Sequence, residues 1–297
     1  TSDHEVNIKI LLDQAVRTGK LDADRRKAVL VEMTGEVAQQ VLRNTYLQTQ
    51  AISLMERFSV ERLGAMKHFI DVLEDSGALD RELEFLPDEA EIEDRRLRKQ
   101  GFTRPELSVV LSYAKIDLYD GLIASGQTLE DFLVVDPLRY FPTVLRRRYF
   151  DYFAGHRLSR QILATLIAND LINRMGPSFV KRIQADTGAD VVTVARAYTI
   201  ARQICQARPL LKTIESLDYE LPATTQVAMM FEISRTLRHA CYWLIEQYGE
   251  DLDIVETVDR LKDGMNRVYA RSSSYVSRAM QARMQQAQAE WLSMGVP

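Results

Sequence analysis

Two asparagines near the middle of the chain stand out because amide side chains, which can bind a ligand or each other's helices, lie close to an apolar helical face. Asn169 and Asn173 are four residues apart in a stretch whose apolar residues recur every three or four positions, which predicts a helix with one wide apolar face. Both amides lie near that face rather than opposite it. Because a buried amide without partners costs about 1–3 kcal/mol, we expect both to be hydrogen-bonded between helices. We favour a polar pair that fixes helix register over a ligand contact.

A second stretch imitates a phosphate-binding loop in its glycine spacing. Gly121 and Gly126 are placed as in such a loop, but Gln127 stands where the phosphate-binding lysine belongs, and a helix rather than a strand precedes it. The end of a helix explains these glycines better. No Gly-x-Gly-x-x-Gly occurs, so the chain has no dinucleotide-binding fingerprint of its own.

The residue types that usually hold metals or act as nucleophiles are scattered. The chain has four histidines, far apart in sequence: His4, His68, His156 and His239. No His-Glu-x-x-His or Cys-x-x-Cys pair occurs, so we expect no metal site. No Gly-x-Ser-x-Gly elbow is present either. A Ser/His/Asp constellation is left open by the sequence, and we assign no catalytic residue.

One basic cluster could attract phosphate groups. Arg146, Arg147 and Arg148 are consecutive, with tyrosines and further arginines nearby. Three adjacent residues of a helix point in three directions, so they cannot form one row of contacts. We therefore expect salt bridges to the acidic region Asp71–Asp94 or to another subunit, rather than nucleic-acid binding.

The composition is that of a globular protein without a strong electrostatic preference. In 297 residues, 46% are hydrophobic, 27% are charged, and the net charge is -4, which favours neither nucleic acid nor anionic membranes. Cys205 and Cys241 fall at apolar helical positions and are expected to be reduced core thiols of a cytoplasmic protein. No apolar run approaches the roughly 20 residues of a membrane span. The chain has no initiator Met, so we expect a fragment of a longer protein.

The predicted elements are all helices, because nearly every segment combines a cap, an apolar stripe and a stop. Gly176-Pro177 ends one helix and starts the next, and Asp190 is expected to cap the following one. One helix is expected to end near Leu30, and the next is expected to begin near Thr34. No segment alternates with period two, so we predict an all-α fold, an elongated array or bundle of helices with short connections. The acidic region marks the best boundary, between domains 1–75 and 76–297.

Four stretches resemble one enzyme family, in the same order along the chain. They are Thr1–Leu11 (TSDHEVNIKIL), Glu32–Gln50 (EMTGEVAQQVLRNTYLQTQ), Gly101–Ile116 (GFTRPELSVVLSYAKI) and Leu163–Gly188 (LATLIANDLINRMGPSFVKRIQADTG). They look like the C-terminal region of the large, NAD-specific glutamate dehydrogenases of bacteria. The resemblance implies that the chain begins at the last helix of a truncated Rossmann catalytic domain, and that the intact enzyme uses NAD to deaminate L-glutamate oxidatively. The family's catalytic Lys and Asp lie upstream, and the chain has no dinucleotide-binding fingerprint. The fragment alone is therefore expected to bind no NAD and to be inactive.

Ser2 is the one substrate-binding residue that the resemblance implies. By itself, the spacing of Ser2 and Glu5 is a capping box, and its cap is worth about 1 kcal/mol. Glutamate dehydrogenases end their nucleotide-binding domain with Gly-Gly-Val-x-Val-Ser-x-x-Glu, whose tail resembles the segment 1–5, with Thr1 in place of Val. The resemblance maps Ser2 onto the serine that contacts the substrate's side-chain carboxylate. Both roles are compatible, since a helix N-terminus also favours a carboxylate.

The function we expect is therefore a supporting, assembly or regulatory role within a glutamate dehydrogenase. The expected partners are the rest of the polypeptide, other subunits of a homo-oligomer and, in the intact enzyme, glutamate. The alternative hypothesis, from a different class of function, is a free-standing α-helical interaction or scaffold protein without catalysis. A nucleic-acid-binding module that uses Arg146–Arg148 is a third reading, which the acidic net charge disfavours.

Overall fold

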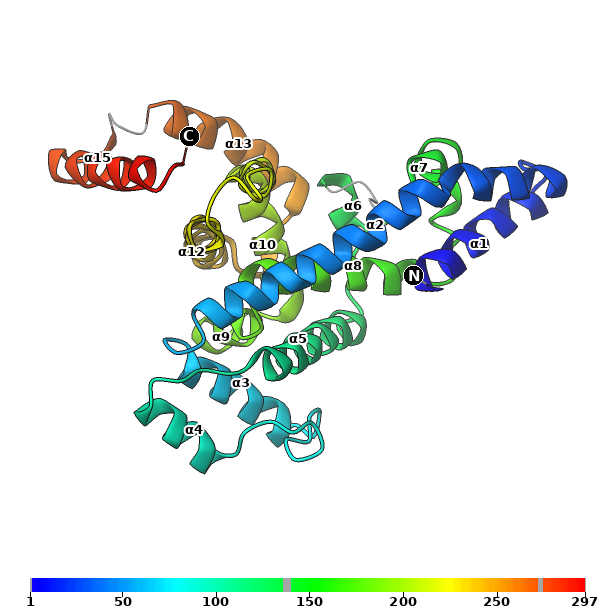
Figure 1. Cartoon of the computed structure of the whole chain (residues 1–297). Helices are drawn as coiled ribbons and strands as arrows, with labels where there is room; N and C mark the ends of the chain where they lie inside the picture. The colour runs from blue at the N-terminus through cyan, green and yellow to red at the C-terminus, as the bar shows by residue number, and fades with distance from the viewer. Residues whose placement is uncertain (1, 136–139, 272–274, 297) are drawn as a thin grey trace. The chain divides into compact units, whose positions relative to one another are not determined.

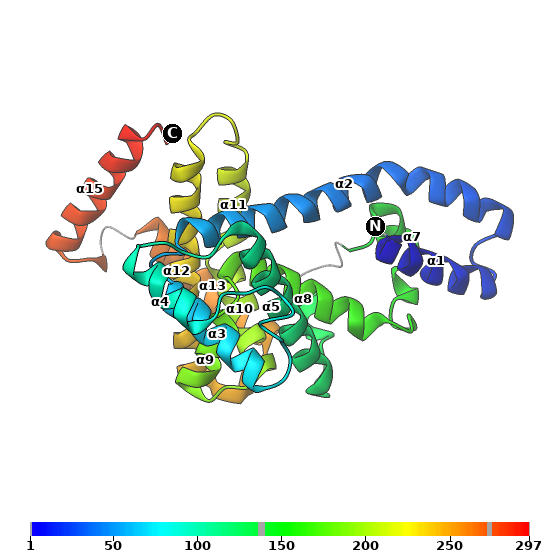
Figure 2. The same cartoon turned by 60° about the horizontal axis from the view of Figure 1, so that its bottom comes forward.

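The computed structural model describes residues 2–135, 140–271 and 275–296, except for the side chains of residues 2, 3, 134 and 135. This part of the chain contains helices and turns but no strand, which confirms the predicted all-α fold. The chain divides into two compact units, Thr1–Phe179 and Val180–Pro297. Figures 1 and 2 show their helices from two sides. The predicted domain boundary, between residues 75 and 76, stays a prediction.

The first unit is built around three helices that contact one another: α2, α5 and α8. Its elements, in chain order, are α1 (Ser2–Arg17), α2 (Ala23–Arg57), α3 (Leu63–Asp75), α4 (Glu89–Leu97), α5 (Arg104–Ala124), α6 (Asp131–Val135), α7 (Thr143–Arg148), the 3-10 turn η1 (Phe150–Tyr152) and α8 (Ser159–Met175). Helix α1 runs back alongside α2, as both views show.

Helix α2 corrects one prediction. The expected break between Leu30 and Thr34 is absent, and one helix of 35 residues runs from Ala23 to Arg57. The segment contains no proline, Gly35 keeps a helical backbone, and the Thr34 hydroxyl donates to the Leu30 carbonyl 3.2 Å away. Without a steric or hydrogen-bonding reason to stop, a helix continues, because each added residue gains a backbone hydrogen bond.

Helix α5 lies against α8, and their apolar faces form the centre of the first unit. Six apolar residues of α5, which follow the three- and four-residue spacing of one helix face, are all buried: Leu107, Val110, Leu111, Ala114, Leu118 and Leu122. A capping box of Thr103 and Glu106 starts the helix. At its other end the guanidinium of Arg160, from α8, donates to the carbonyls of Leu122, Ile123 and Gln127 at 2.6–3.2 Å. These bonds satisfy carbonyls that a helix end leaves free.

The second unit surrounds one almost fully buried helix, α10 (Val191–Ile204). The predicted cap is confirmed, since the Asp190 carboxylate accepts a hydrogen bond from the Thr193 amide at 2.7 Å. Helix α10 contacts α11 (Ala207–Glu215), α12 (Ala223–Tyr248) and α13 (Ile254–Ala270). The other elements are α9 (Phe179–Thr187), η2 (Gly249–Asp251) and α15 (Arg278–Ser293). Cys205 and Cys241 are buried and free, as expected of core thiols. Among the described helices, none has the length and hydropathy to cross a bilayer.

Candidate functional site

Helix α1 begins at Ser2, the residue for which a substrate contact is predicted. The side chain of Ser2 lies outside the described residues, so its contacts with a substrate or with the Glu5 region stay predictions. Glu5 itself is exposed and pairs with Lys9 one turn later. The hydrogen bond from Lys9 lowers the pKa of the Glu5 carboxyl below its ordinary value.

A buried polar cluster holds the first turns of α1. The ring of His4 stacks on Tyr140, with centroids 4.2 Å apart and planes 13° apart. The Asn7 side-chain amide donates to the Tyr140 hydroxyl at 2.7 Å. His4, Asn7 and Tyr140 are each no more than 8% exposed. Because burial strengthens such hydrogen bonds and penalises their loss, the cluster fixes α1 to the segment that carries Tyr140.

His156 adds a third contact to this cluster through the backbone of α1. Its Nδ1 accepts from the Leu158 amide at 3.1 Å, and its Nε2 lies 3.1 Å from the Asn7 carbonyl. An Nδ1 that accepts leaves the proton on Nε2, which then donates to that carbonyl. Burial lowers the pKa of His156, outweighing the opposite effect of the Asn7 hydrogen bond. The ring is therefore neutral at pH 7 and serves as a structural donor and acceptor.

Further hydrogen bonds attach residues 143–155 to α1 and α2. The side chain of Gln14 donates to the Gly155 carbonyl at 2.5 Å, and the Thr18 hydroxyl donates to that of Tyr152 at 2.8 Å. The Glu36 carboxylate accepts from the Thr143 amide at 2.8 and 2.9 Å and from its hydroxyl at 2.9 Å. Contacts of this kind run along most of α1 and reach into the first half of α2.

Two residues of the arginine cluster form salt bridges to α2. Arg146 lies 3.6 Å from Glu36, and Arg148 lies 3.3 Å from Glu32. The prediction of salt bridges is confirmed for these two arginines, but their partners lie on α2 and not in Asp71–Asp94. That region is neutralised locally instead, for example by Arg81, whose guanidinium lies 2.6 Å from Asp71. A salt bridge to another subunit stays a prediction.

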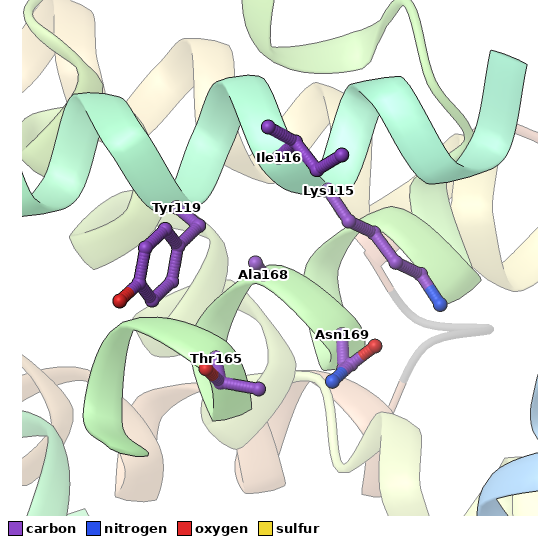
Figure 3. A pocket seen from close by; sticks show the side chains of 6 residues that line it. All are labelled: Lys115, Ile116, Tyr119, Thr165, Ala168 and Asn169. Carbon is purple, nitrogen blue, oxygen red and sulfur yellow. The ribbon is translucent and has the colours of Figure 1, made fainter. Parts of the chain in front are cut away.

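The two asparagines of α8 are one turn apart but have different surroundings. Asn169 is half-buried and lines a groove between α5 and α8 (Figure 3). Asn173 is 8% exposed, and its Oδ1 has no hydrogen-bond partner among the described residues. Within that same part of the chain, neither side chain makes the interhelical hydrogen bond that the sequence suggested. The helical stripe predicts where the amides lie, but not what faces them.

Side chains that could bind a metal ion do not cluster in the described residues. They contain no group of three or more His, Cys, Asp or Glu side chains able to hold a metal ion. The fold and the buried cluster thus define an all-α region whose polar groups fasten its own first helix.

Comparison with known proteins gives the family. A model of the C-terminal region of glutamate dehydrogenase matches residues 99–297, and a model of the catalytic domain of bacterial NAD-glutamate dehydrogenase matches residues 1–55. The chain belongs to the glutamate dehydrogenase family, and the resemblance found in the sequence is confirmed.

Three relatives, each named NAD-specific glutamate dehydrogenase, show how much of such a protein is present. The protein of Pseudomonas aeruginosa is 44% identical over 257 residues, which are 86% of this chain and 16% of the relative. That of Halomonas elongata is 46% identical over 246 residues, 83% of this chain and 15% of the relative. That of Mycobacterium tuberculosis is 30% identical over 296 residues, 100% of this chain and 18% of the relative. The chain spans only this small share of these curated relatives.

The buried cluster around Asn7 is the group of contacts that sequence reasoning missed. His4 and His156 are 152 positions apart, and Asn7 and Tyr140 are 133 apart. No local pattern links such positions, because the contact forms only when residues 140–156 fold against α1. The only sequence signal was the presence of polar residues, such as Asn7 and His156, beside apolar helical positions.

Proposed function

We propose that the chain is the C-terminal helical portion of an NAD-dependent glutamate dehydrogenase. The intact enzyme would use NAD to deaminate L-glutamate oxidatively to 2-oxoglutarate and ammonia, as the names of the relatives suggest. The lysine and aspartate that act on the substrate in this family belong to the part of the enzyme upstream. This chain would neither bind NAD nor turn over glutamate by itself.

The role we assign to the chain is to hold the last helix of the catalytic domain in place. One observation supports this role. Helix α1 lies inside the stretch that matches the catalytic domain, whereas Tyr140 and His156 lie inside the stretch that matches the C-terminal region. The hydrogen bonds from Asn7 to Tyr140 and from His156 to Asn7 therefore join the two regions. Since α1 begins at Ser2, fixing α1 would also fix the serine expected to contact glutamate.

The remaining partners follow from this role. The rest of the polypeptide would cover the part of α1 and α2 that the helical region leaves open, and other subunits would complete a homo-oligomer. We place the protein in the cytoplasm, and expect it to bind neither nucleic acid nor membrane. The catalytic domain would end, and the C-terminal domain begin, near residue 75, between the two matching stretches.

The proposed role is tested by Tyr140→Phe in the intact enzyme. The substitution removes the hydroxyl that accepts a hydrogen bond from Asn7. It leaves the buried Asn7 amide unpaired, which should lower the free energy of unfolding by about 1–3 kcal/mol. If α1 then shifts, kcat/KM for glutamate should fall about fivefold or more, because a loss of about 1 kcal/mol in transition-state binding corresponds to about a fivefold change. KM for NAD should change much less, because the predicted contact of α1 is with the amino acid. Steady-state kinetics with each substrate varied in turn gives both values.

Tyr113→Phe is the matched control for this test. The Tyr113 hydroxyl donates to Glu84 at 2.6 Å, so this variant also loses one tyrosine hydrogen bond, but away from α1. A purely structural role for Tyr140 would give the two variants the same kinetic constants. Equal kinetics at equal loss of stability would therefore refute the positioning role. NAD reduction by the purified 297-residue chain with glutamate would refute the assignment of the chain as non-catalytic.

A further inference from the structure

A groove between α5 and α8 contains polar groups that the fold does not use. Six residues line it, three from each helix: Lys115, Ile116, Tyr119, Thr165, Ala168 and Asn169. Its volume is about 250 Å³, below the roughly 300–1,000 Å³ of pockets for drug-sized ligands. Figure 3 shows Lys115 and Asn169 at one end, Tyr119 and Thr165 at the other, and Ala168 between them. The space suits a small metabolite rather than a nucleotide.

Lys115 is unusual among the basic residues of this unit. It is half-buried, yet it makes no hydrogen bond or ion pair with any residue that the structure describes. Burial lowers its pKa to about 8, and no carboxylate offsets this effect. Arg95, by contrast, contacts Glu106 at 2.7 Å, and Lys67 contacts Asp71 at 2.8 Å. A half-buried ammonium without a counter-ion is unfavourable, and an anion bound in the groove would offset this cost.

Two neutral groups in the groove are also unused. Within the described part of the chain, neither the Asn169 amide nor the Tyr119 hydroxyl makes a hydrogen bond. The Thr165 hydroxyl donates to the Gln161 carbonyl at 2.8 Å, which leaves its oxygen able to accept. The groove thus offers a cationic donor and an amide at one end, and hydroxyl oxygens at the other. Between them, Ala168 and the side of Ile116 provide apolar contact.

We propose that this groove binds a small monocarboxylate that carries a second polar group. The carboxylate would lie between the Lys115 ammonium and the Asn169 amide, because one ammonium balances one negative charge. The apolar middle of the ligand would cover Ala168. A hydroxyl or amino group at its far end would donate to Thr165 or Tyr119. No lining residue is acidic, so nothing in the groove repels a carboxylate. This binding does not depend on the activity proposed above.

The test is chemical labelling of Lys115 with limiting acetic anhydride, on the intact enzyme and on the 297-residue chain. Peptide mapping by mass spectrometry reports each lysine separately. The probes are 4-hydroxybutyrate, inorganic phosphate and 4-hydroxybutyramide, which has nearly the shape of the carboxylate but no charge. Lys99, which is exposed, is the internal control. We expect 4-hydroxybutyrate to slow acetylation of Lys115 several-fold at saturation while Lys99 is unaffected.

The charge is the distinguishing feature of the proposed ligand. Because hydrogen bonds to charged groups are about twice as strong as neutral ones, the uncharged amide should need about tenfold or more higher concentration for the same protection. Equal protection by the amide would reduce the groove to an apolar contact site and overturn the proposal. Stronger protection by phosphate would overturn the choice of a carboxylate. A lack of protection by 4-hydroxybutyrate at millimolar concentration, or a Lys115 that is inaccessible in the intact enzyme, would overturn it as well.

Two variants connect the labelling to the geometry. Asn169→Leu keeps Lys115 available for labelling but removes the amide, so the half-protecting concentration of 4-hydroxybutyrate should rise about fivefold or more. Lys115→Met should abolish binding of 4-hydroxybutyrate measured by calorimetry, and should fold normally because it removes a half-buried unpaired charge. Lys99→Met is its control and should bind as the unaltered chain does. Unchanged binding by the Lys115→Met variant would refute the proposed site.

Discussion

Asn173→Leu should stabilise the chain, against the usual direction of a buried substitution. Asn173 is 8% exposed, and its Oδ1 finds no partner among the described residues. An unsatisfied buried group costs about 1–3 kcal/mol, and leucine of similar size removes that cost while adding apolar contact. We therefore expect the free energy of unfolding to rise by about 1–3 kcal/mol. In a chain of this size, that increase corresponds to a thermal unfolding midpoint (Tm) about 2–10 °C higher.

The assay is urea unfolding of the purified chain, followed by circular dichroism at 222 nm and by calorimetry. Asn169→Leu is the matched control, since Asn169 is one turn away on the same helix but only half-buried in the groove. Asn169→Leu should change the free energy of unfolding by no more than about 0.5 kcal/mol, as most substitutions near the surface do. A loss of more than about 1 kcal/mol in Asn173→Leu, with an unchanged slope, would mean that the amide has a partner and would refute the reasoning.

Two further substitutions test the local packing. Glu106→Gln should lower the free energy of unfolding at pH 7 by about 1.5–3 kcal/mol, because Glu106 accepts two hydrogen bonds from Arg95 at 2.7 and 2.8 Å and one from the Thr103 amide. Burial raises the pKa of Glu106, but these hydrogen bonds outweigh burial, and the pKa is lowered from its ordinary value of 4.5. The contribution of the Glu106 carboxylate to stability is therefore fully present at a pH above 4.5. It is lost as the pH falls through the folded-state pKa, and a difference between the two proteins that persists in strong acid would contradict this account. Gly101→Ala should lower the free energy of unfolding by about 1–3 kcal/mol, because a methyl group at this position would lie 1.9 Å from the Ser59 hydroxyl oxygen. Gly64→Ala, where a methyl group meets nothing within 4 Å, should be neutral or stabilising in the same denaturation experiment, and similar losses in both would refute the steric argument.

The sequence by itself determined the helices and their inward faces. The capping pattern at Asp190 and the six inward residues of α5 were predictable because caps and apolar stripes depend on residues within one or two turns. The family was also readable from the sequence, since four stretches resemble it in order and the matching family models cover residues 1–55 and 99–297. Local signals still leave room for error, as the continuous helix α2 shows at Thr34.

Only the tertiary structure decided which distant side chains meet. Asn7 and Tyr140 are 133 positions apart, and nothing in either local pattern specifies the other. The same holds for Arg148 and Glu32, because a charged side chain can pair with any opposite charge that the packing brings near. The position of Asn173 beside an apolar stripe was visible in the sequence, but whether its amide is satisfied depends on the helix opposite. Such contacts arise from the packing of whole helices, and periodicity fixes only which face of a helix takes part.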